Sequence, residues 1–183
     1  MESPLKILKN MTIAEIASIV SSTLEAAGIT AVLSGGSVVS IYSENEYESQ
    51  DLDFISPADK DKLAEVMYQI GFSKQNKYFA HPDTDYFVEF PASTLAIGHE
   101  YIPYKDCAVL QVGDRKIYLL TPTQCVMDRL AAFYHWFDRQ SLDQALMVAK
   151  RHIIDLRKVK SWSKKEGHPK KYDEFLENLW KPR

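Results

Sequence analysis

The feature that most constrains this chain is the stretch VLSGGSVVSIYSENEYESQDLDFI, residues 32–55. An apolar strand runs into Gly35-Gly36-Ser37, and a second strand follows with Asp51 and Asp53 on either side of one leucine. A strand that enters a helix through such a turn presents backbone N–H groups where the helix dipole favours phosphate. Glycine suits the turn because a larger side chain would block an approaching anion. By itself such a glycine motif is more often an ordinary tight turn.

Asp51 and Asp53 are expected to lie on one face of a strand. Side chains alternate between faces and the rise is near 3.3 Å per residue, so residues two apart point the same way, about 7 Å apart. Two carboxylates on one face repel each other unless a cation lies between them, and Mg²⁺ prefers carboxylate and phosphate oxygens together. A solvated strand edge would explain the acidic pair alone. The turn and the pair together favour a site for a metal ion and a phosphate.

A third carboxylate is available in the apolar stretch TDYFVEF, residues 84–90, where Glu89 lies between Val88 and Phe90. An acid in such a strand is costly to bury unless a cation compensates its charge. Glu89 is therefore the candidate third acid, and an edge strand with Glu89 in water is the alternative. Asp85, on the same face at the start of the strand, is the second choice.

The rest of the chain predicts a mixed helix and strand body followed by a helical end. Thr12-Ile13-Ala14-Glu15 has the form of a capping box, which predicts a helix from about Thr12 to Ala27. Strands are expected over 29–33, 51–55, 72–80, 85–90, 108–112 and 116–120, and helices over 38–42, 58–70, 122–137, 141–152, 156–164 and 169–180. We expect an α/β (α+β) fold, with a short mixed sheet flanked by helices over residues 1–120 and a C-terminal helical extension over 121–183 packed on that core.

Composition favours some protein classes and cellular compartments over others. The chain of 183 residues is 45% hydrophobic and 26% charged, a balance that favours a globular protein over a disordered one. No apolar run approaches the roughly 18 residues of a membrane span, so no membrane partner is expected. Cys107 and Cys125 form no CxxC pair and no secretory leader is recognised, so reduced thiols in the cytoplasm are expected. The five histidines match no zinc-binding spacing, so no zinc site is expected.

Gly35-Gly36-Ser37, separated by thirteen residues from Asp51-Leu52-Asp53, resembles the signature of the DNA polymerase beta nucleotidyltransferase superfamily. In that superfamily a glycine-serine turn precedes an Asp-x-Asp strand, and a third acid lies on a later strand. The stretch Thr121–Ala132 resembles the helical segment of small bacterial members, which include minimal nucleotidyltransferases and toxins of toxin–antitoxin pairs. Two departures stand out, because Glu89 replaces the commoner aspartate and Ser34 replaces an apolar residue before the glycines.

The resemblance implies transfer of a nucleoside monophosphate (NMP) from a nucleoside triphosphate (NTP) such as ATP to an acceptor hydroxyl, with release of pyrophosphate. By that resemblance two Mg²⁺ (or Mn²⁺) ions would be held by Asp51, Asp53 and Glu89, and the phosphates by Gly35, Gly36 and Ser37. Arg129 and Arg139 would add positive charge, and they would share a face if one helix continued through both. Surface ion pairs are the alternative for both arginines.

The acceptor is not encoded in these motifs, because RNA (a tRNA end included), a protein and a small antibiotic all offer a hydroxyl. Specificity is expected to reside in loops such as 43–50 and 95–105, and a cognate partner protein would accompany a toxin–antitoxin type. Lys and Arg outnumber Asp and Glu after Lys150, which fits a solvated helical face or contact with RNA phosphates. The competing hypothesis is a catalytically inactive nucleotidyltransferase-fold binding module, antitoxin-like or regulatory. The orientation of Glu89 separates the two hypotheses.

Overall fold

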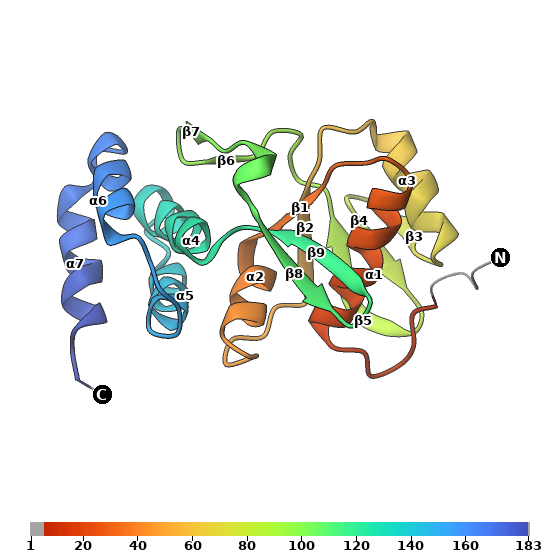
Figure 1. The fold of residues 1–183 in the computed structure, drawn as a ribbon, viewed down its shortest axis with the longest axis horizontal. Helices are drawn as coiled ribbons and strands as arrows, with labels where there is room; N and C mark the ends of the chain where they lie inside the picture. Colours follow the sequence, from red (N-terminus) through yellow and green to blue (C-terminus); the bar gives the residue numbers. More distant parts are fainter. Residues whose placement is uncertain (1–5, 183) are drawn as a thin grey trace.

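The computed structural model describes residues 6–182 of the chain (Figure 1). Its elements are, in order, α1 (Ile13–Ala26), β1 (Val32–Ser34), α2 (Gly35–Tyr42), β2 (Asp51–Ile55), α3 (Lys60–Gln69), β3 (Ser73–Gln75), β4 (Tyr78–His81), β5 (Thr84–Glu89), β6 (Ala96–Ile97), β7 (Glu100–Tyr101), a 3-10 turn η1 (Tyr104–Asp106), β8 (Ala108–Val112), β9 (Arg115–Leu119), α4 (Pro122–Trp136), α5 (Arg139–Ala149), α6 (Leu156–Lys165) and α7 (Pro169–Leu179). The predicted order of a mixed body and a helical end is confirmed.

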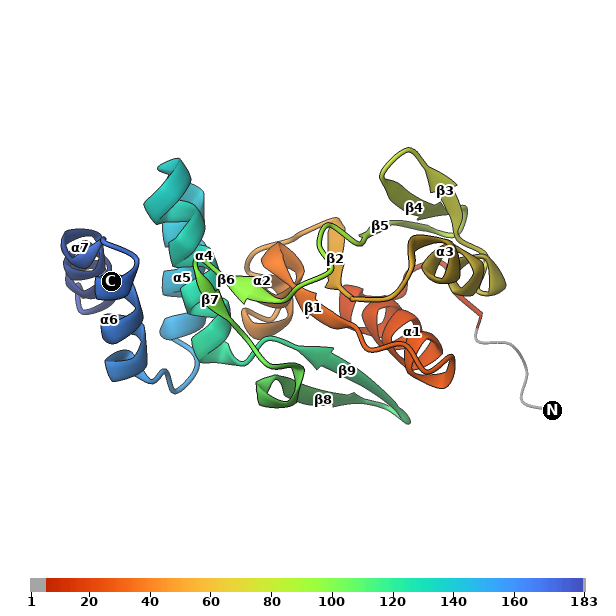
Figure 2. The ribbon, with the colours of Figure 1, turned by 90° about the horizontal axis from the view of Figure 1, so that it is seen from above.

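The body is a mixed seven-stranded sheet with the strand order β3-β4-β5-β2-β1-β9-β8, and β6 and β7 form a separate hairpin. β2 is parallel to β5 and β1 is parallel to β9, while the other neighbouring strands are antiparallel. Figure 2 shows α1 and α3 on one side of this sheet and α2 with the C-terminal helices on the other. The expected α/β fold with a mixed sheet flanked by helices is confirmed.

The two central acidic strands have one buried face and one polar face. Leu52, Phe54 and Val88 are fully buried. Asp53 and Glu89, which alternate with these residues along their strands, are only half-buried. Alternation along β2 therefore directs the apolar side chains into the core and leaves the acids on the opposite face, as the period of a strand requires.

Local signals start α1 and α4 where the sequence predicts them. Thr12 accepts a hydrogen bond from the Glu15 amide and the Glu15 side chain accepts one from Thr12 N, so the capping box of α1 forms. A second capping box, with Pro122 at the first helical position, begins α4.

The strand predicted over 29–33 covers 32–34, and the helix predicted over 38–42 begins at Gly35, so the glycines form its first turn. Two further segments differ from the expectation. The single strand predicted over 72–80 is wrong, because Asn76 adopts a left-handed conformation (φ 56°) and turns the chain into the β3–β4 hairpin. The expected loop 95–105 contains the β6–β7 hairpin, whose turn residue Gly98 has a φ of 58°.

The helical end is joined to the body by hydrogen bonds. The His152 ring lies 2.7 Å from the Tyr42 carbonyl oxygen, and within the body the Tyr42 hydroxyl donates to the Leu120 carbonyl at 2.7 Å. Trp162 donates its indole N–H to the Ile97 carbonyl at 3.2 Å, which ties α6 to the β6–β7 hairpin. One hydrophobic cluster extends from α1 through the sheet to α7.

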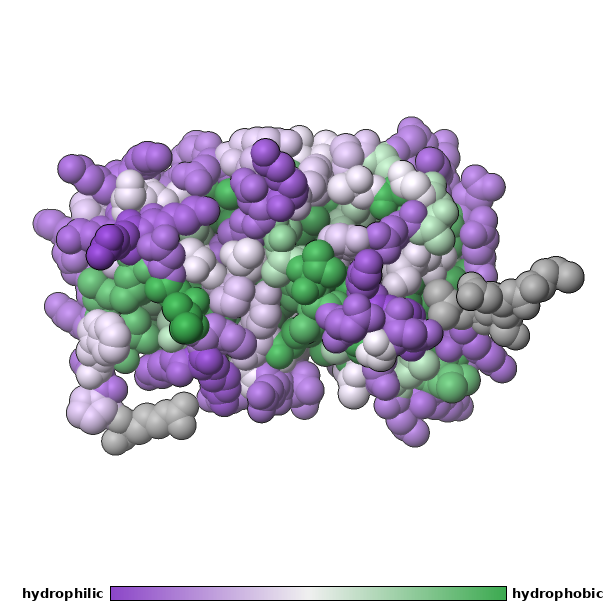
Figure 3. Space-filling view, viewed as in Figure 1, coloured by the Kyte–Doolittle hydropathy of each residue, from purple (hydrophilic) through white to green (hydrophobic). Residues whose placement is uncertain are grey.

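The outer surface is mostly polar. On the face in Figure 3, apolar side chains gather over β8 and β9 and over the C-terminal helices, and polar surface separates the two areas. Within residues 6–182, no helix combines the length and the apolar character that crossing a bilayer requires.

Candidate active site

The three acids singled out by the sequence come together on the polar face of β2 and β5. Asp53 pairs with Glu89 in the parallel register of these strands. Neighbouring strands lie about 4.8 Å apart and residues in register point to the same face, so these two side chains are neighbours. Asp51 lies two residues earlier on the same face, paired with Phe87. Asp85 lies four residues before Glu89, ahead of the first residue that pairs with β2, and is exposed.

The arrangement of these acids affects the pKa of Asp53. Burial, reinforced by the charges of Glu89 and Asp51, raises the pKa of Asp53 to about 6 from the usual 3.8. Arg129 opposes this rise, and Asp128 adds to it. Carboxylates that share a site repel one another when ionised, and a cation between them would relieve that repulsion. The acidic face therefore has the charge that a metal site requires.

The glycine turn lies directly against Asp53. α2 begins at Gly35 immediately after β1, and Ser34 makes no side-chain cap to the first turn of that helix. Gly35 has a φ of 70°, and a Cβ built on it would lie 2.8 Å from Asp53 Oδ2. The amide groups of the helix start, which attract anions, are thus adjacent to the carboxylates that would attract a cation.

Ser37 and Gly36 have different surroundings. Ser37 is fully buried, and its hydroxyl donates to the Ser34 carbonyl at 3.0 Å, so in this conformation it offers a ligand its backbone amide rather than its hydroxyl proton. A Cβ on Gly36 would lie 3.2 Å from Tyr47 and 3.3 Å from the Ser49 hydroxyl. The loop 43–50 therefore packs on the turn and encloses one side of the site.

The two candidate arginines lie in different environments. Arg129, on α4, is 18% exposed; it pairs with Asp128 and donates to Gln144 Oε1 at 3.3 Å. Its effect on the pKa of Asp53 places its charge within electrostatic reach of the acids. Arg139 begins α5, is 65% exposed and pairs with Glu174.

The condition that would align Arg129 and Arg139 on one face is not met. α4 ends at Trp136 because Phe137 adopts a left-handed conformation (φ 56°), and the chain turns before α5 starts. One continuous helix through both arginines does not form. Of the two, only Arg129 affects Asp53.

Two further charged residues near the acids have no motif in the sequence. The Lys77 ammonium lies 3.4 Å from a Glu89 carboxylate oxygen, and it reaches that position from the β3–β4 turn. Asp128 contributes to the raised pKa of Asp53 from α4. The turn at Asn76 places Lys77 near Glu89. Sequence analysis missed this turn because residues 72–80 have the pattern of one continuous strand. Asp128 adjoins Arg129 in the helical stretch that resembles small nucleotidyltransferases.

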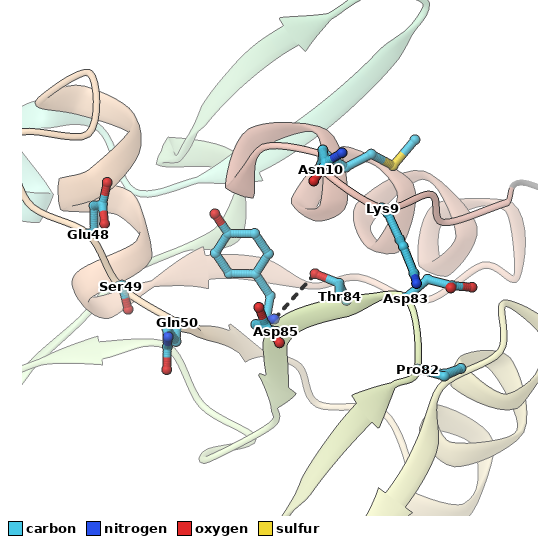
Figure 4. Close-up of a pocket in the computed structure, with 11 residues that line it drawn as sticks. Lys9, Asn10, Glu48, Ser49, Gln50, Pro82, Asp83, Thr84 and Asp85 are labelled. Carbon is cyan, nitrogen blue, oxygen red and sulfur yellow. Dashed lines mark hydrogen bonds between the residues drawn. The ribbon is translucent and has the colours of Figure 1, made fainter.

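A polar hollow of about 520 Å³ opens beside Ser49, Gln50 and Asp85 (Figure 4). Figure 4 shows Glu48 and Gln50 on one side of it and Lys9 and Asp83 on the other. None of the three candidate acids lines this hollow. It is nevertheless joined to the first of them, because Ser49 Oγ donates to the Asp51 carbonyl at 3.1 Å and accepts from the Asp51 amide at 3.2 Å.

A second group of side chains, which histidine spacing in the sequence did not indicate, has the residue types and proximity that could hold a metal ion. His99, His135 and Glu166 lie together, with one ligand atom of each within 4.8 Å of the others. Their positions in the sequence match no zinc motif because three separate segments supply them. Tertiary packing, rather than local spacing, forms the group.

Comparisons by sequence and by structure give different results. A search of protein-family profiles gives no match, and neither does a search of curated protein sequences. Among solved structures, an antigenic nucleotidyltransferase-like protein from Paracoccidioides brasiliensis superposes with a TM-score of 0.54 at 14% identity, over 77% of each chain. ANT(2″)-Ia in complex with adenylyl-2″-tobramycin superposes with a TM-score of 0.50 at 9% identity, over 91% of this chain and 95% of that one. The chain therefore has the fold of nucleotidyltransferase-like proteins.

Proposed function

We propose that the chain is a metal-dependent nucleotidyltransferase, which moves an NMP from an NTP to an acceptor hydroxyl and releases pyrophosphate. The observation that carries this proposal is the meeting of Asp53 with Glu89 on one side and with the Gly35 turn on the other. The fold shared with nucleotidyltransferase-like proteins supports it. We assign the transferase core to residues 1–120, and the helical extension to residues 121–183.

The acids fit Mg²⁺ or Mn²⁺, because carboxylate oxygens are the ligands these ions prefer and because a cation would offset the burial and the like-charge repulsion that raise the pKa of Asp53. When bound, such ions polarise phosphoryl oxygens and make an attacking hydroxyl more acidic. Asp51 and Asp53 would hold the ions, and Glu89 would complete the set and accept the proton of the acceptor hydroxyl. The backbone amides of Gly35, Gly36 and Ser37 would bind the phosphates.

Positive charge for the triphosphate would come from Arg129 and Lys77. Arg129 is half-buried, which limits screening by water and strengthens its attraction for a phosphate. Lys77 is 79% exposed on a turn, so it can exchange Glu89 for a phosphate oxygen when a nucleotide binds. Arg139 pairs with Glu174 and is not needed in this arrangement.

Two hollows near the acids carry opposite charges. The one beside Ser49 is lined by Lys9 against Glu48, Asp83 and Asp85, so its net charge is negative. The one that Glu89 lines also holds Lys60, Lys74 and Lys77, so its net charge is positive. A polyanion such as tRNA would be repelled by the first and attracted by the second, so these charges favour neither RNA nor a small molecule or protein as the acceptor. The structure of ANT(2″)-Ia holds adenylyl-2″-tobramycin, which makes tobramycin the first small acceptor to test.

The second candidate function is a nucleotide-binding module without turnover. Two observations favour it, because Glu89 is paired with Lys77 and the Ser37 hydroxyl is engaged within its own turn. In that case an antitoxin-like or regulatory role with a partner protein would replace catalysis.

The toxin–antitoxin type and a bacterial source are proposed from the sequence resemblance. A cytoplasmic setting is proposed from the cysteine pattern.

The test uses each of the four NTPs labelled at the α-phosphate, with Mg²⁺ or Mn²⁺ and with tobramycin, tRNA or cell extract as acceptor. We expect pyrophosphate release and a labelled acceptor with the wild-type chain, and neither with the Asp51→Asn/Asp53→Asn double variant. Melting temperatures with each metal-NTP pair are measured in parallel. A ligand-dependent rise without label transfer would support the binding module, and no rise together with no transfer would overturn both readings.

A further inference from the structure

Glu166 follows α6 and has a carboxylate that is almost fully buried, with 2% of the side chain exposed. His99, in the β6–β7 turn, donates its backbone N–H to Glu166 Oε1 at 2.8 Å. Two imidazoles face the other oxygen, with His99 Nδ1 at 2.7 Å and His135 Nε2 at 3.0 Å from Oε2. His99 from a hairpin and His135 from the end of α4 thus converge on one carboxylate oxygen of Glu166, which follows α6.

The spacing of these atoms is close to that of a coordination shell. The three ligand atoms lie within 4.8 Å of one another, and two of the separations are 2.7 and 3.0 Å. Ligand atoms about 2.1 Å from a tetrahedral zinc ion are about 3.4 Å from one another. Side-chain shifts of less than about 1 Å would therefore admit an ion, and the backbone could remain in place.

The two oxygens of Glu166 also have the separate contacts that are typical of a metal-binding carboxylate. Oε1 is held by the His99 backbone amide, and Oε2 faces both imidazoles. A carboxylate with one oxygen fixed by a hydrogen bond is oriented to bind an ion through its other oxygen. Gly98 permits this contact, because a Cβ there would lie 2.5 Å from Glu166 Oε2 and its φ is 58°.

We propose that His99, His135 and Glu166 form a binding site for a zinc-class divalent ion, separate from the acids of the candidate active site. Two imidazole nitrogens and one carboxylate oxygen favour zinc and neighbouring transition metals over Mg²⁺, which prefers oxygen ligands alone. The ion enters from water past His99, whose side chain is 82% exposed, and a water molecule takes the fourth position. Each coordinating nitrogen gives up its proton, either to the other nitrogen of its ring or to solvent.

The bound ion links the β6–β7 hairpin to the C-terminal helices. Figure 2 shows this hairpin beside α4, the helix that carries His135 at one end and Arg129 near its middle. Trp162 already ties α6 to Ile97 of the same hairpin. An ion at His99 adds a second tie, which holds α4 in place against the segment that follows β5. The expected consequence is a more stable fold and slower opening of the hairpin.

The test begins with the full chain stripped of metal with EDTA. Zinc sulfate is titrated calorimetrically, and bound zinc is counted after gel filtration. We expect one zinc ion per chain, a melting temperature that rises by several degrees with Zn²⁺ and not with Mg²⁺, and slower amide exchange in residues 96–101. Cobalt(II) should give the intense visible absorption of a tetrahedral site.

Variants separate this site from adventitious binding and from the proposed active site. His99→Ala, at an exposed side chain, should keep its circular dichroism spectrum and lose zinc affinity by more than about tenfold; Glu166→Gln should do the same if it folds. His81→Ala and the Asp51→Asn/Asp53→Asn double variant should keep the zinc affinity of the wild type. Equal zinc binding by wild type and His99→Ala, no zinc binding by wild type, or loss of zinc only in the double aspartate variant would each overturn the proposal.

Discussion

Asp53 and Gly35 are so close that a Cβ built on Gly35 would lie 2.8 Å from Asp53 Oδ2. Gly35 also has a φ of 70°, which L side chains rarely adopt. Glycine is therefore required at this position for two reasons. The backbone conformation disfavours other residues, and a side chain would collide with the Asp53 carboxylate. This contact joins the glycine turn to the acidic strand, and it supplies the first test of the proposed site.

Gly35→Ala should disrupt both the fold and the site, and Gly113→Ala is the matched control. Gly113 also has a positive φ, of 61°, but nothing lies within 4 Å of a Cβ there. Both variants should lose about 1–2 kcal/mol of stability to the left-handed conformation. Only Gly35→Ala should lose more than that, and only it should lose the melting-temperature rise with metal and NTP, because its methyl group displaces Asp53. Identical behaviour of the two variants would show that the contact has no role.

Asp53→Asn should stabilise the metal-free protein at neutral pH. The pKa of Asp53 is raised in the fold to about 6 from 3.8, so its contribution to stability is fully present below about pH 4 and is lost as the pH rises through 6. Asparagine does not ionise, so the variant should gain about 1–3 kcal/mol at pH 8 and less at pH 5. Urea unfolding in EDTA at the two pH values measures the difference.

The same Asp53→Asn variant should lose the stabilisation by metal and NTP and lose nucleotide transfer. Catalytic residues are commonly retained at a cost in stability. A variant that is less stable than the wild type at pH 8 and still responds to metal and NTP would assign Asp53 a structural role.

Glu89→Gln should abolish transfer and weaken binding of the metal-NTP pair, whereas Asp85→Asn should leave that binding unchanged. Glu89 pairs with Asp53 in the parallel register, and Asp85 is exposed ahead of the paired residues. Glutamine keeps the size of the side chain and removes the charge that a metal ion requires. Calorimetric titration with Mg²⁺ and NTP compares the two variants. The reverse outcome, in which only Asp85→Asn loses affinity, would make Asp85 the third acid.

Arg129→Gln should weaken NTP binding by about tenfold or more, while Arg139→Gln should have little effect. Arg129 holds the pKa of Asp53 down, so its loss should raise that pKa further and move the pH dependence of metal-NTP binding to higher pH. Arg139 is 65% exposed and pairs with Glu174. Binding is measured from pH 5 to pH 8. An unchanged pH dependence in Arg129→Gln would remove Arg129 from the site.

The sequence by itself determined the elements whose geometry depends on near neighbours. The capping box of Thr12 and Glu15 begins α1, and the alternation along β2 separates the acids from Leu52 and Phe54. These features follow from backbone geometry over a few residues. The turn at Gly35 could be predicted for the same reason, since glycine is the residue that enters a helix from a strand with a positive φ.

Only the tertiary structure decided which distant segments meet. The register of β2 with β5 placed Glu89, rather than Asp85, beside Asp53, the turn at Asn76 brought Lys77 to Glu89, and the break at Phe137 separated Arg139 from Arg129. Packing of the β6–β7 hairpin on the helices likewise gathered His99, His135 and Glu166, whose spacing in the sequence indicated nothing. Strand register and helix packing depend on burial summed over the whole core, and no short stretch of sequence contains that sum.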